Sequence, residues 1–294
     1  MLYLIVTILL NTIISAIFKI FPKYNIDNLQ AIVANYFACV VIGSLFMGHF
    51  PIDHISITQA WFPWSLLMGV GFISVFNMFA YCTKVDGITT STIANKLSLV
   101  IPVIFSIFLY SEHAGAIKIA GILLAFPAVY LTSRVKGTDN KAQSLLWPTL
   151  LFIGSGLLDT LTKYSEHNFL PTQDVQATFT VHVFASAALI GVIVVTTLVA
   201  TNRIKLHWRN IIAGICLAIP NFFSIYYFIR MLNSDFLQSS AAIPVNNIGI
   251  LVASSLMAIF FFREKVTSYR VIGLLLSVVS ILLIAFADIH GRGL

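Results

Sequence analysis

Long apolar runs recur along the whole chain, and they limit the folds that it can adopt. Each run is close to the roughly 20 residues that an α-helix needs to cross a bilayer. Hydrophobic residues make up 59% of the chain and charged residues only 10%, against about 25% charged residues in an ordinary soluble domain. We predict ten spans, at about residues 2–21, 28–48, 63–82, 90–110, 116–133, 145–162, 174–200, 210–229, 239–262 and 268–288.

The spans are predicted to be helices, because the runs are too long for membrane strands and lack their alternating pattern. The connecting segments are short, so we expect no soluble domain. The first run lacks a basic leader and a small-residue cleavage site, and we interpret it as a span and not as a signal peptide. The predicted fold class is therefore an all-α integral membrane protein.

The final part of a helical hairpin occurs twice in the sequence. In each copy an acid is followed six positions later by a base and nine positions later by a glycine. The two copies are Glu112, Lys118 and Gly121, and Glu264, Arg270 and Gly273. Five spans fall in each half of the chain, and five is odd, so the second half enters the membrane from the opposite side. The sequence therefore predicts two inverted five-helix repeats, an arrangement typical of secondary transporters.

The two halves also match at their starts. Three polar residues spaced four apart share one face of a helix in the first span and again in the sixth. These residues are Asn11, Ser15 and Lys19, and Ser155, Asp159 and Lys163. Lys19 and Lys163 thus occupy equivalent positions, whereas Asp159 stands where the first half has Ser15.

The net charge of +6 comes mostly from bases in the loops that follow odd-numbered spans. The positive-inside rule places such loops in the cytoplasm, so both termini are predicted to face outward. Loop charges of this kind orient a membrane protein, and we expect no nucleic-acid partner. The bases are Lys23, Lys84, Arg134, Lys136, Lys141, Arg203, Lys205, Arg209, Arg263, Lys265 and Arg270.

The repeat, the spans and the paired motifs resemble the drug/metabolite transporter superfamily, specifically its EamA-like members. The residues that carry the resemblance are Lys19, Glu112 with Gly121, and Glu264 with Gly273. The resemblance implies a ten-helix transporter in which residues 1–135 and 145–290 form the two EamA-like repeats. It also implies a multi-pass protein of the inner membrane that moves small metabolites such as amino acids, as a monomer or a homodimer. Many members of this superfamily place both termini in the cytoplasm, which conflicts with the charge distribution.

Polar residues inside the spans are the candidates for substrate binding. A charge at mid-bilayer costs about 2.5–3.5 kcal/mol on insertion scales, so each should face a partner or water. The charged candidates are Lys19, Lys96, Asp159, Lys163 and Arg230. The neutral candidates are Asn77, Tyr81, Asn95, Asn221, Tyr226, Asn246 and Asn247.

Each set of candidates has two interpretations. Asp159 and Lys163 can form a structural ion pair while Lys19 extends to the interface. Alternatively the bases hold a substrate carboxylate or phosphate, and Asp159 accepts a proton or an amine. The neutral residues either line a cavity or join helices. Glu112 and Glu264 are interpreted as helix caps with a base nearby.

Several chemistries lack sequence support. There is no nucleotide-binding loop, Gly-x-Ser-x-Gly elbow or His-Glu-x-x-His motif. Cys39, Cys82 and Cys216 show no disulfide or metal spacing, and we expect no catalytic residue, metal or cofactor. The leading hypothesis is a secondary transporter of small polar metabolites, either an exporter or a proton-coupled exchanger. The alternatives are a membrane-embedded lipid-modifying enzyme and a non-transporting membrane subunit. For the enzyme, the only close cluster of candidate residues near an interface is His49, Asp53 and His54.

Overall fold

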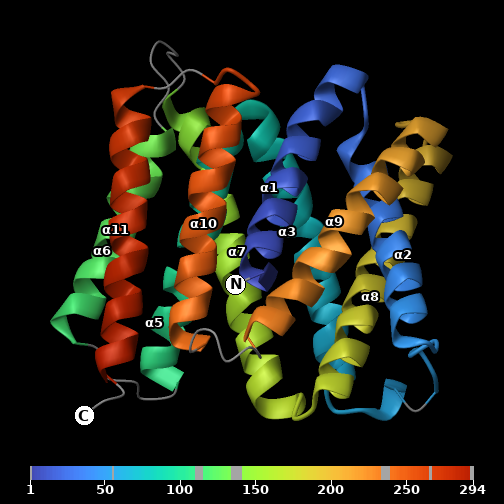
Figure 1. Ribbon diagram of the computed structural model, residues 1–294. Coiled ribbons are helices and arrows are strands. Elements are labelled where there is room, and N and C mark those ends of the chain that lie inside the picture. Colours follow the sequence, from blue (N-terminus) through green and yellow to red (C-terminus); the bar gives the residue numbers. More distant parts are fainter. Residues whose placement is uncertain are drawn as a thin grey trace. The chain divides into compact units, whose positions relative to one another are not determined.

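The computed structural model describes residues 2–54, 56–109, 115–133, 141–232, 239–264 and 267–291, and every regular element in these ranges is helical (Figure 1). Two short 3-10 helices, η1 (Phe21–Tyr24) and η2 (Ser56–Thr58), lie in connections. The α-helices are α1 (Leu2–Ile20), α2 (Asn28–Met47), α3 (Phe62–Val85), α4 (Ile88–Leu97), α5 (Val100–Leu109), α6 (Ala116–Ser133), α7 (Lys141–Phe169), α8 (Gln173–Ala200), α9 (Trp208–Leu232), α10 (Ser239–Phe260) and α11 (Ser268–Gly291).

Eight helical segments within the described ranges are long and apolar enough to cross a membrane. One of them runs from Ile88 to Phe105 and combines α4 with the first part of α5. Shorter apolar helices occur at Ala116–Leu131 and Val245–Phe260. The chain therefore has the helices of a multi-pass membrane protein.

The predicted span at 90–110 differs from the structure, because the helix breaks between α4 and α5. Pro102 explains the break: proline lacks an N–H group, and its ring clashes with the carbonyl four residues earlier, which belongs to Ser98. The Ser98 carbonyl instead accepts the N–H of Ile101 at 2.9 Å, and the Ser98 hydroxyl donates to the carbonyl of Asn95 at 2.5 Å. A tight turn thus replaces one turn of the expected helix.

The chain divides into two compact units, which differ from the two predicted sequence repeats. Unit 1 contains Met1–Lys19, Met78–Leu157 and Phe223–Leu294, and unit 2 contains Ile20–Asn77 and Leu158–Phe222. Each unit therefore takes segments from both halves of the sequence.

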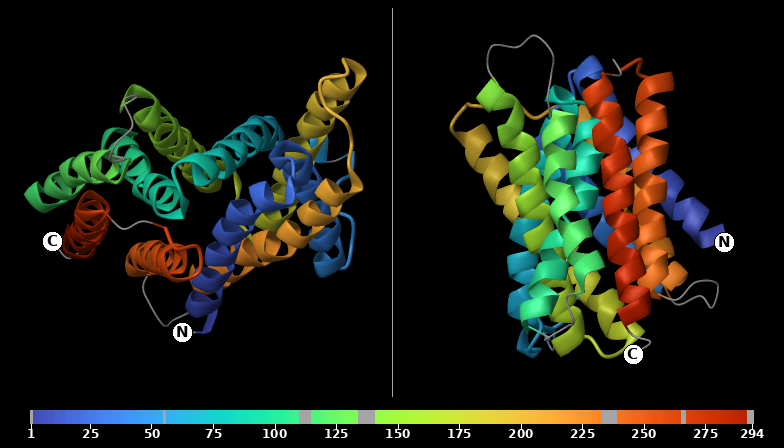
Figure 2. Two further views of the ribbon diagram at one scale, coloured as in Figure 1. Left: turned by 90° about the horizontal axis from the view of Figure 1, so that it is seen from above. Right: turned by 90° about the vertical axis from the view of Figure 1, so that its left-hand side faces the viewer.

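In unit 1, α6 and α11 lie side by side along most of their lengths (Figures 1 and 2). A side chain at Gly121 would lie 2.8 Å from Ile284 and 3.0 Å from the carbonyl of Ser280, so glycine permits this approach. The Ser280 hydroxyl then donates to the carbonyl of Gly121 at 2.7 Å. Gly121 of the repeated motif therefore lies at a close contact between two helices. Helix α10 packs on α4 and α11, and α4 also packs on α6.

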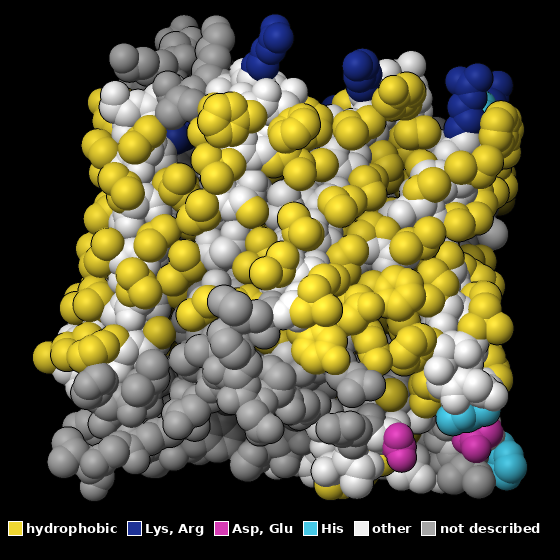
Figure 3. Space-filling model, in the orientation of Figure 1, with side chains coloured by type: hydrophobic (Ala, Val, Ile, Leu, Met, Phe, Trp, Pro, Cys, Tyr) yellow, Lys and Arg dark blue, Asp and Glu magenta, His cyan; other side chains and the backbone are white. Residues whose placement is uncertain are grey.

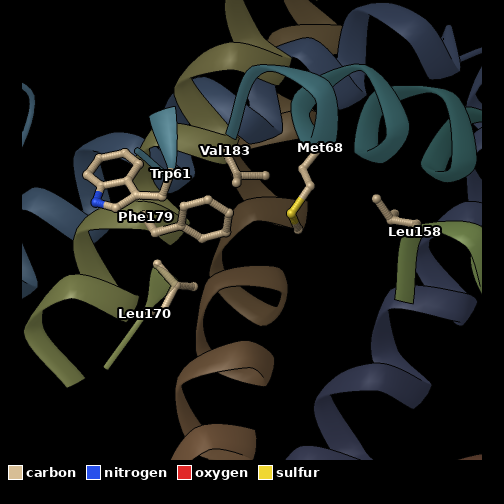
Figure 4. Packing of buried hydrophobic residues seen from close by; sticks show 6 residues of the cluster. All are labelled: Trp61, Met68, Leu158, Leu170, Phe179 and Val183. Atoms are coloured by element: carbon tan, nitrogen blue, oxygen red, sulfur yellow. The ribbon is translucent and has the colours of Figure 1, made fainter. Parts of the chain in front are cut away.

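In unit 2, α2 packs along α8, and an aromatic cluster fills the core near the start of α3. Trp61 meets Phe179 edge to face, with ring centroids 5.8 Å apart. Figure 4 shows how side chains from different segments converge here. The buried members of the cluster are Trp61, Met68, Leu158, Leu170, Phe179 and Val183.

Exposed apolar side chains repeat at helical spacing along several helices. On α2 they recur every fourth residue at Phe37, Val41 and Leu45, and on α11 at Val271, Leu275 and Val279. Large contiguous apolar faces of this kind are unusual on soluble monomers. Their presence supports contact with lipid.

Charged side chains in unit 2 gather beyond the two ends of α2. The connection from α8 to α9 carries Arg203 and Lys205, and it is joined to the start of α2 because Gln30 donates to the carbonyl of Lys205 at 3.0 Å. The opposite end of α2 leads to exposed His49 and Asp53. Figure 3 shows Lys and Arg at one edge of the apolar surface over α2 and acidic and His side chains at the other. The predicted outward orientation of the termini depends on this asymmetry and stays a prediction.

Candidate functional site: a buried charged cluster in unit 1

Four charged residues from separate segments of unit 1 meet where α4 begins. We call Lys19, Asp86, Glu264 and Arg270 the charged cluster. Lys19 lies in the last turn of α1, and Asp86 lies in the connection between α3 and α4. Glu264 follows α10, and Arg270 lies in the first turn of α11.

The carboxylate of Glu264 joins three of these segments. Its Oε1 atom lies 3.1 Å from the ammonium of Lys19 and accepts the backbone N–H of Ile88, the first residue of α4, at 2.8 Å. A helix N-terminus has unsatisfied N–H groups and a partial positive charge, so a carboxylate there is favoured. The position of Glu264 in the loop before α11 suggested a cap for α11. Glu264 instead caps α4, which is distant in the sequence. The equivalent Glu112 lies outside the described residues.

Gly87 makes room for this carboxylate. Its backbone has φ +96°, which glycine adopts without strain. A side chain at this position would lie 2.7 Å from Glu264 Oε2. The Asp86–Gly87 pair thus both reverses the chain and exposes the N–H of Ile88 to Glu264.

The two basic residues also bind backbone carbonyls at the end of α3. Arg270 donates from Nη2 to the carbonyl of Asp86 at 2.9 Å, while its Nη1 atom lies 3.9 Å from Glu264 Oε2. Lys19 donates to the carbonyl of Thr83 at 3.4 Å. The side chain of Glu264 is 8% exposed, that of Arg270 16% and that of Lys19 24%. The cluster is therefore largely shielded from solvent.

The carboxyl group of Asp86 has weaker support than that of Glu264. Asp86 is 4% exposed, and the thiol of Cys82 donates to its Oδ2 atom at 3.6 Å. Burial raises the pKa of Asp86 to about 6, although the thiol and the positive charges of Arg270 and Lys19 act to lower it. Asp86 can therefore change its charge near physiological pH.

A small pocket, with a cavity volume of about 30 Å³, lies beside the cluster. Two buried oxygen atoms in it, Glu264 Oε2 and the hydroxyl of Ser255, have no hydrogen-bond partner among the described residues. A ligand with a hydrogen-bond donor could bind to the first, and Arg270 offers a positive charge to an anionic group. The lining residues are Thr89, Ser255, Ile259, Glu264, Arg270, Val271 and Leu274. The described residues contain no group of three or more His, Cys, Asp or Glu side chains that could hold a metal ion.

Two of the other predicted site residues in unit 1 have partners outside the cluster. Asn95 donates to the hydroxyl of Ser155 at 3.0 Å, and the ring of Tyr81 lies 4.5 Å from that of Trp147. Asn246 is buried, and its Oδ1 atom has no hydrogen-bond partner in the described part of the chain. Lys96, Tyr226 and Asn247 are half-buried, and the side chain of Arg230 lies outside the description.

The remaining candidates belong to unit 2. Asn77 donates to the carbonyl of Ile73 within its own helix at 2.8 Å. Asn221 donates to Asn35 Oδ1 at 3.3 Å and joins α9 to α2. Asp159 is exposed, and the side chain of Lys163 lies outside the description, so the predicted ion pair between them is untested.

Sequence reasoning found Lys19 but gave Asp86 no role. An Asp-Gly pair directly after an apolar run is a turn signal, and it could have marked this position. It could not have shown that Glu264 and Arg270 come to the same turn, since that contact depends on the packing of α11 and α10 near α4.

Comparisons with known proteins bear on the fold. No family model matches the sequence. A protein of Haemophilus influenzae described as uncharacterized is 25% identical over 293 residues, which cover 97% of this chain and 98% of that protein. A crystal structure described only as that of a protein is similar with a TM-score of 0.59 and 17% sequence identity, and the match covers 99% of this chain and 97% of that one. The helical architecture is therefore also found in a solved structure.

Proposed function

We propose that this protein is a secondary transporter of small polar metabolites, such as amino acids, across the inner membrane. In this proposal ten helices form two inverted repeats, and the α4–α5 pair counts as one broken span. Discontinuous helices beside a binding site are typical of such transporters. The break at Ser98 and the capped start of α4 give this chain one discontinuous span.

The observation that carries the proposal is the packing of equivalent helices on each other. Under the predicted repeat, α2 corresponds to α8, α4 to α10 and α6 to α11. The members of each of these three pairs pack together inside one unit. The contact between α4 and α6 likewise has its equivalent in the contact between α10 and α11. A two-fold axis brings equivalent elements together in this way, so the packing supports an internal two-fold repeat.

The charged cluster supports a transport function for this fold. Burying ion pairs costs desolvation energy, and well-packed apolar residues often stabilise a protein equally well. Ionisable residues buried in membrane bundles commonly mark substrate or proton pathways. Here the cluster lies next to a pocket that contains unpartnered polar atoms, which a purely structural role does not require.

Purified protein in liposomes tests the proposal. We expect vesicles that contain the protein to take up radiolabelled amino acids from a defined mixture faster than empty vesicles do, with a dependence on the proton gradient. If no labelled amino acid, organic acid or phosphorylated metabolite enters faster than into empty vesicles, the transporter proposal is wrong. Turnover of vesicle lipids by the protein would instead support a lipid-modifying enzyme, and inertness in both assays a non-transporting subunit.

A further inference from the structure

We infer that Asp86 binds the coupling proton, and that its protonation frees positive charge on Lys19 and Arg270 to bind an anionic group of the substrate. The inference rests on the proposed transport function and assigns the proton and the substrate's anionic group to one cluster. Sequence reasoning instead gave the proton to Asp159.

The geometry around Asp86 is that of a carboxyl group that is buried without a strong partner. Within the described ranges, the thiol of Cys82 is the one hydrogen-bond donor to this carboxylate. Thiols are weak donors. Glu264, by contrast, accepts a backbone N–H and pairs with Lys19. Protonation therefore sacrifices fewer favourable interactions at Asp86 than it would at Glu264.

The charged and titratable groups that face Asp86 come from three helices and one connection. Lys19 acts on the carboxyl group of Asp86 from α1, Cys82 from α3 and Arg270 from α11. Glu264, in the segment after α10, lies beside the next two residues, Gly87 and Ile88. Arg270 contacts both the backbone of Asp86 and the region of Glu264. A change of charge on Asp86 therefore acts on the same cations that hold Glu264.

Charge balance links the proton to an anion. The formal charges of the four cluster residues sum to zero when Asp86 is ionised. They sum to +1 when Asp86 is protonated, in a poorly hydrated site where electrostatic interactions are strong. An incoming carboxylate or phosphate brings the sum back to zero. By linkage, the anion and the proton then increase each other's affinity by the same factor.

Asp159 is a poorer candidate in this structure. It is exposed and belongs to unit 2, whereas the four residues of the cluster belong to unit 1. Burial raises the pKa of Asp86 to about 6, so Asp86 can exchange a proton across the pH range in which membranes commonly maintain gradients. Asp86 and Asp159 are thus alternative sites for the coupling proton, and experiment can distinguish them.

Infrared titration of the purified protein in liposomes tests the proton site without any substrate. We expect the carbonyl band of a protonated carboxylic acid to appear with a midpoint near pH 6 and to be absent in Asp86→Asn. Cys82→Ser should move the midpoint to lower pH, because a hydroxyl group is a better donor to the charged form. Asp174→Asn, which removes an exposed Asp at the start of α8, controls for loss of a carboxyl group elsewhere. The inference fails if the band persists in Asp86→Asn, or if a folded Cys82→Ser protein keeps the original midpoint.

Transport tests the coupling to the anion. Uptake of the labelled amino-acid mixture by the parent protein should fall by roughly 5- to 150-fold between about pH 5 and about pH 7. Asp86→Asn should abolish most of that dependence. If Asp159→Asn abolishes it and Asp86→Asn does not, Asp159 is the coupling acid and the inference is wrong. If the parent transports none of the probes while the infrared band follows Asp86, the transport function fails and the proton site stands.

Discussion

Unit 1 and unit 2 both bury polar side chains, but the chemistry differs. In unit 2 neutral amides join separate segments: Gln30 donates to the carbonyl of Lys205 at 3.0 Å and accepts from Asn210 at 2.8 Å. Unit 1 also buries neutral groups, but it adds the charged cluster, in which Glu264 Oε2 has no hydrogen-bond partner among the described residues. Neutral hydrogen bonds contribute about 1 kcal/mol each and do not vary with pH. The comparison indicates that unit 2 uses polar groups for packing, whereas the charges of unit 1 can respond to a proton or a ligand.

Removal of the central carboxylate should have the largest effect. Glu264→Ala leaves Lys19, Arg270 and the N–H of Ile88 without their shared acceptor. Loss of one partner of a buried ion pair typically costs about 3–5 kcal/mol of unfolding free energy. Denaturant unfolding in detergent micelles measures the loss.

A double-mutant cycle sharpens this prediction. Lys19→Ala with Glu264→Ala should cost less than the sum of the two single variants, because the second change no longer leaves an unpaired charge. Strictly additive losses of unfolding free energy would show that Lys19 and Glu264 act independently. The ion pair between them would then contribute nothing to the charged cluster.

Gly87→Ala should have the next largest effect. Alanine is strained at φ +96°, and its side chain would displace the Glu264 carboxylate. We expect a loss of about 1–3 kcal/mol. Gly48→Ala in unit 2 is the matched control, because Gly48 also has a positive φ, of +75°, but no atom lies within 4 Å of the added side chain. Equal losses in the two variants would mean that contact with Glu264 contributes nothing.

The buried carboxyl group of Asp86 should make stability depend on pH by up to about 3 kcal/mol, since each pKa unit corresponds to about 1.36 kcal/mol. Folding raises the pKa of Asp86 to about 6, above the value of about 3.9 in an unfolded chain. Below about pH 4 both states hold the proton, and burial of Asp86 carries no charge penalty. As the pH rises towards 6 only the unfolded state has released it, so stability falls, and the loss is complete above pH 6. When melting temperature is plotted against pH, the parent should therefore lose stability relative to Asp86→Asn as the pH rises from about 4 to about 6. Parallel plots for the two proteins would contradict the shift.

The smallest effect is expected in the neutral interior of unit 2. Asn221→Ala removes the hydrogen bond to Asn35 between α9 and α2. Such bonds in membrane bundles average about 0.6 kcal/mol. A loss larger than that of Glu264→Ala, measured in the same detergent, would reverse the comparison between the units.

The sequence predicted most of the helical segments, because the length of an apolar run follows directly from the thickness of the bilayer. The break at Ser98 was missed, although Pro102 carries the physical cause.

The candidate site was less predictable. Lys19 could be selected because a charge at the end of an apolar span needs a partner. Its partner could not be identified, since Glu264 is remote in the sequence and its loop position suggested a local cap. Asp86 has an ordinary turn sequence, and only burial against α1 and α11 gives it unusual chemistry.

Transport by Glu264→Gln tests most directly whether the charged cluster is the working part of a transporter. This variant keeps the size of the side chain and removes its charge. Ser280→Ala, which loses a helix-packing hydrogen bond to Gly121 elsewhere in unit 1, is the control. We predict that parent and Ser280→Ala vesicles take up labelled amino acids alike, and that folded Glu264→Gln loses at least about 90% of the rate, as expected for about 1.4 kcal/mol or more. Uptake by Glu264→Gln at the parental rate would show that the cluster is structural and would contradict the account.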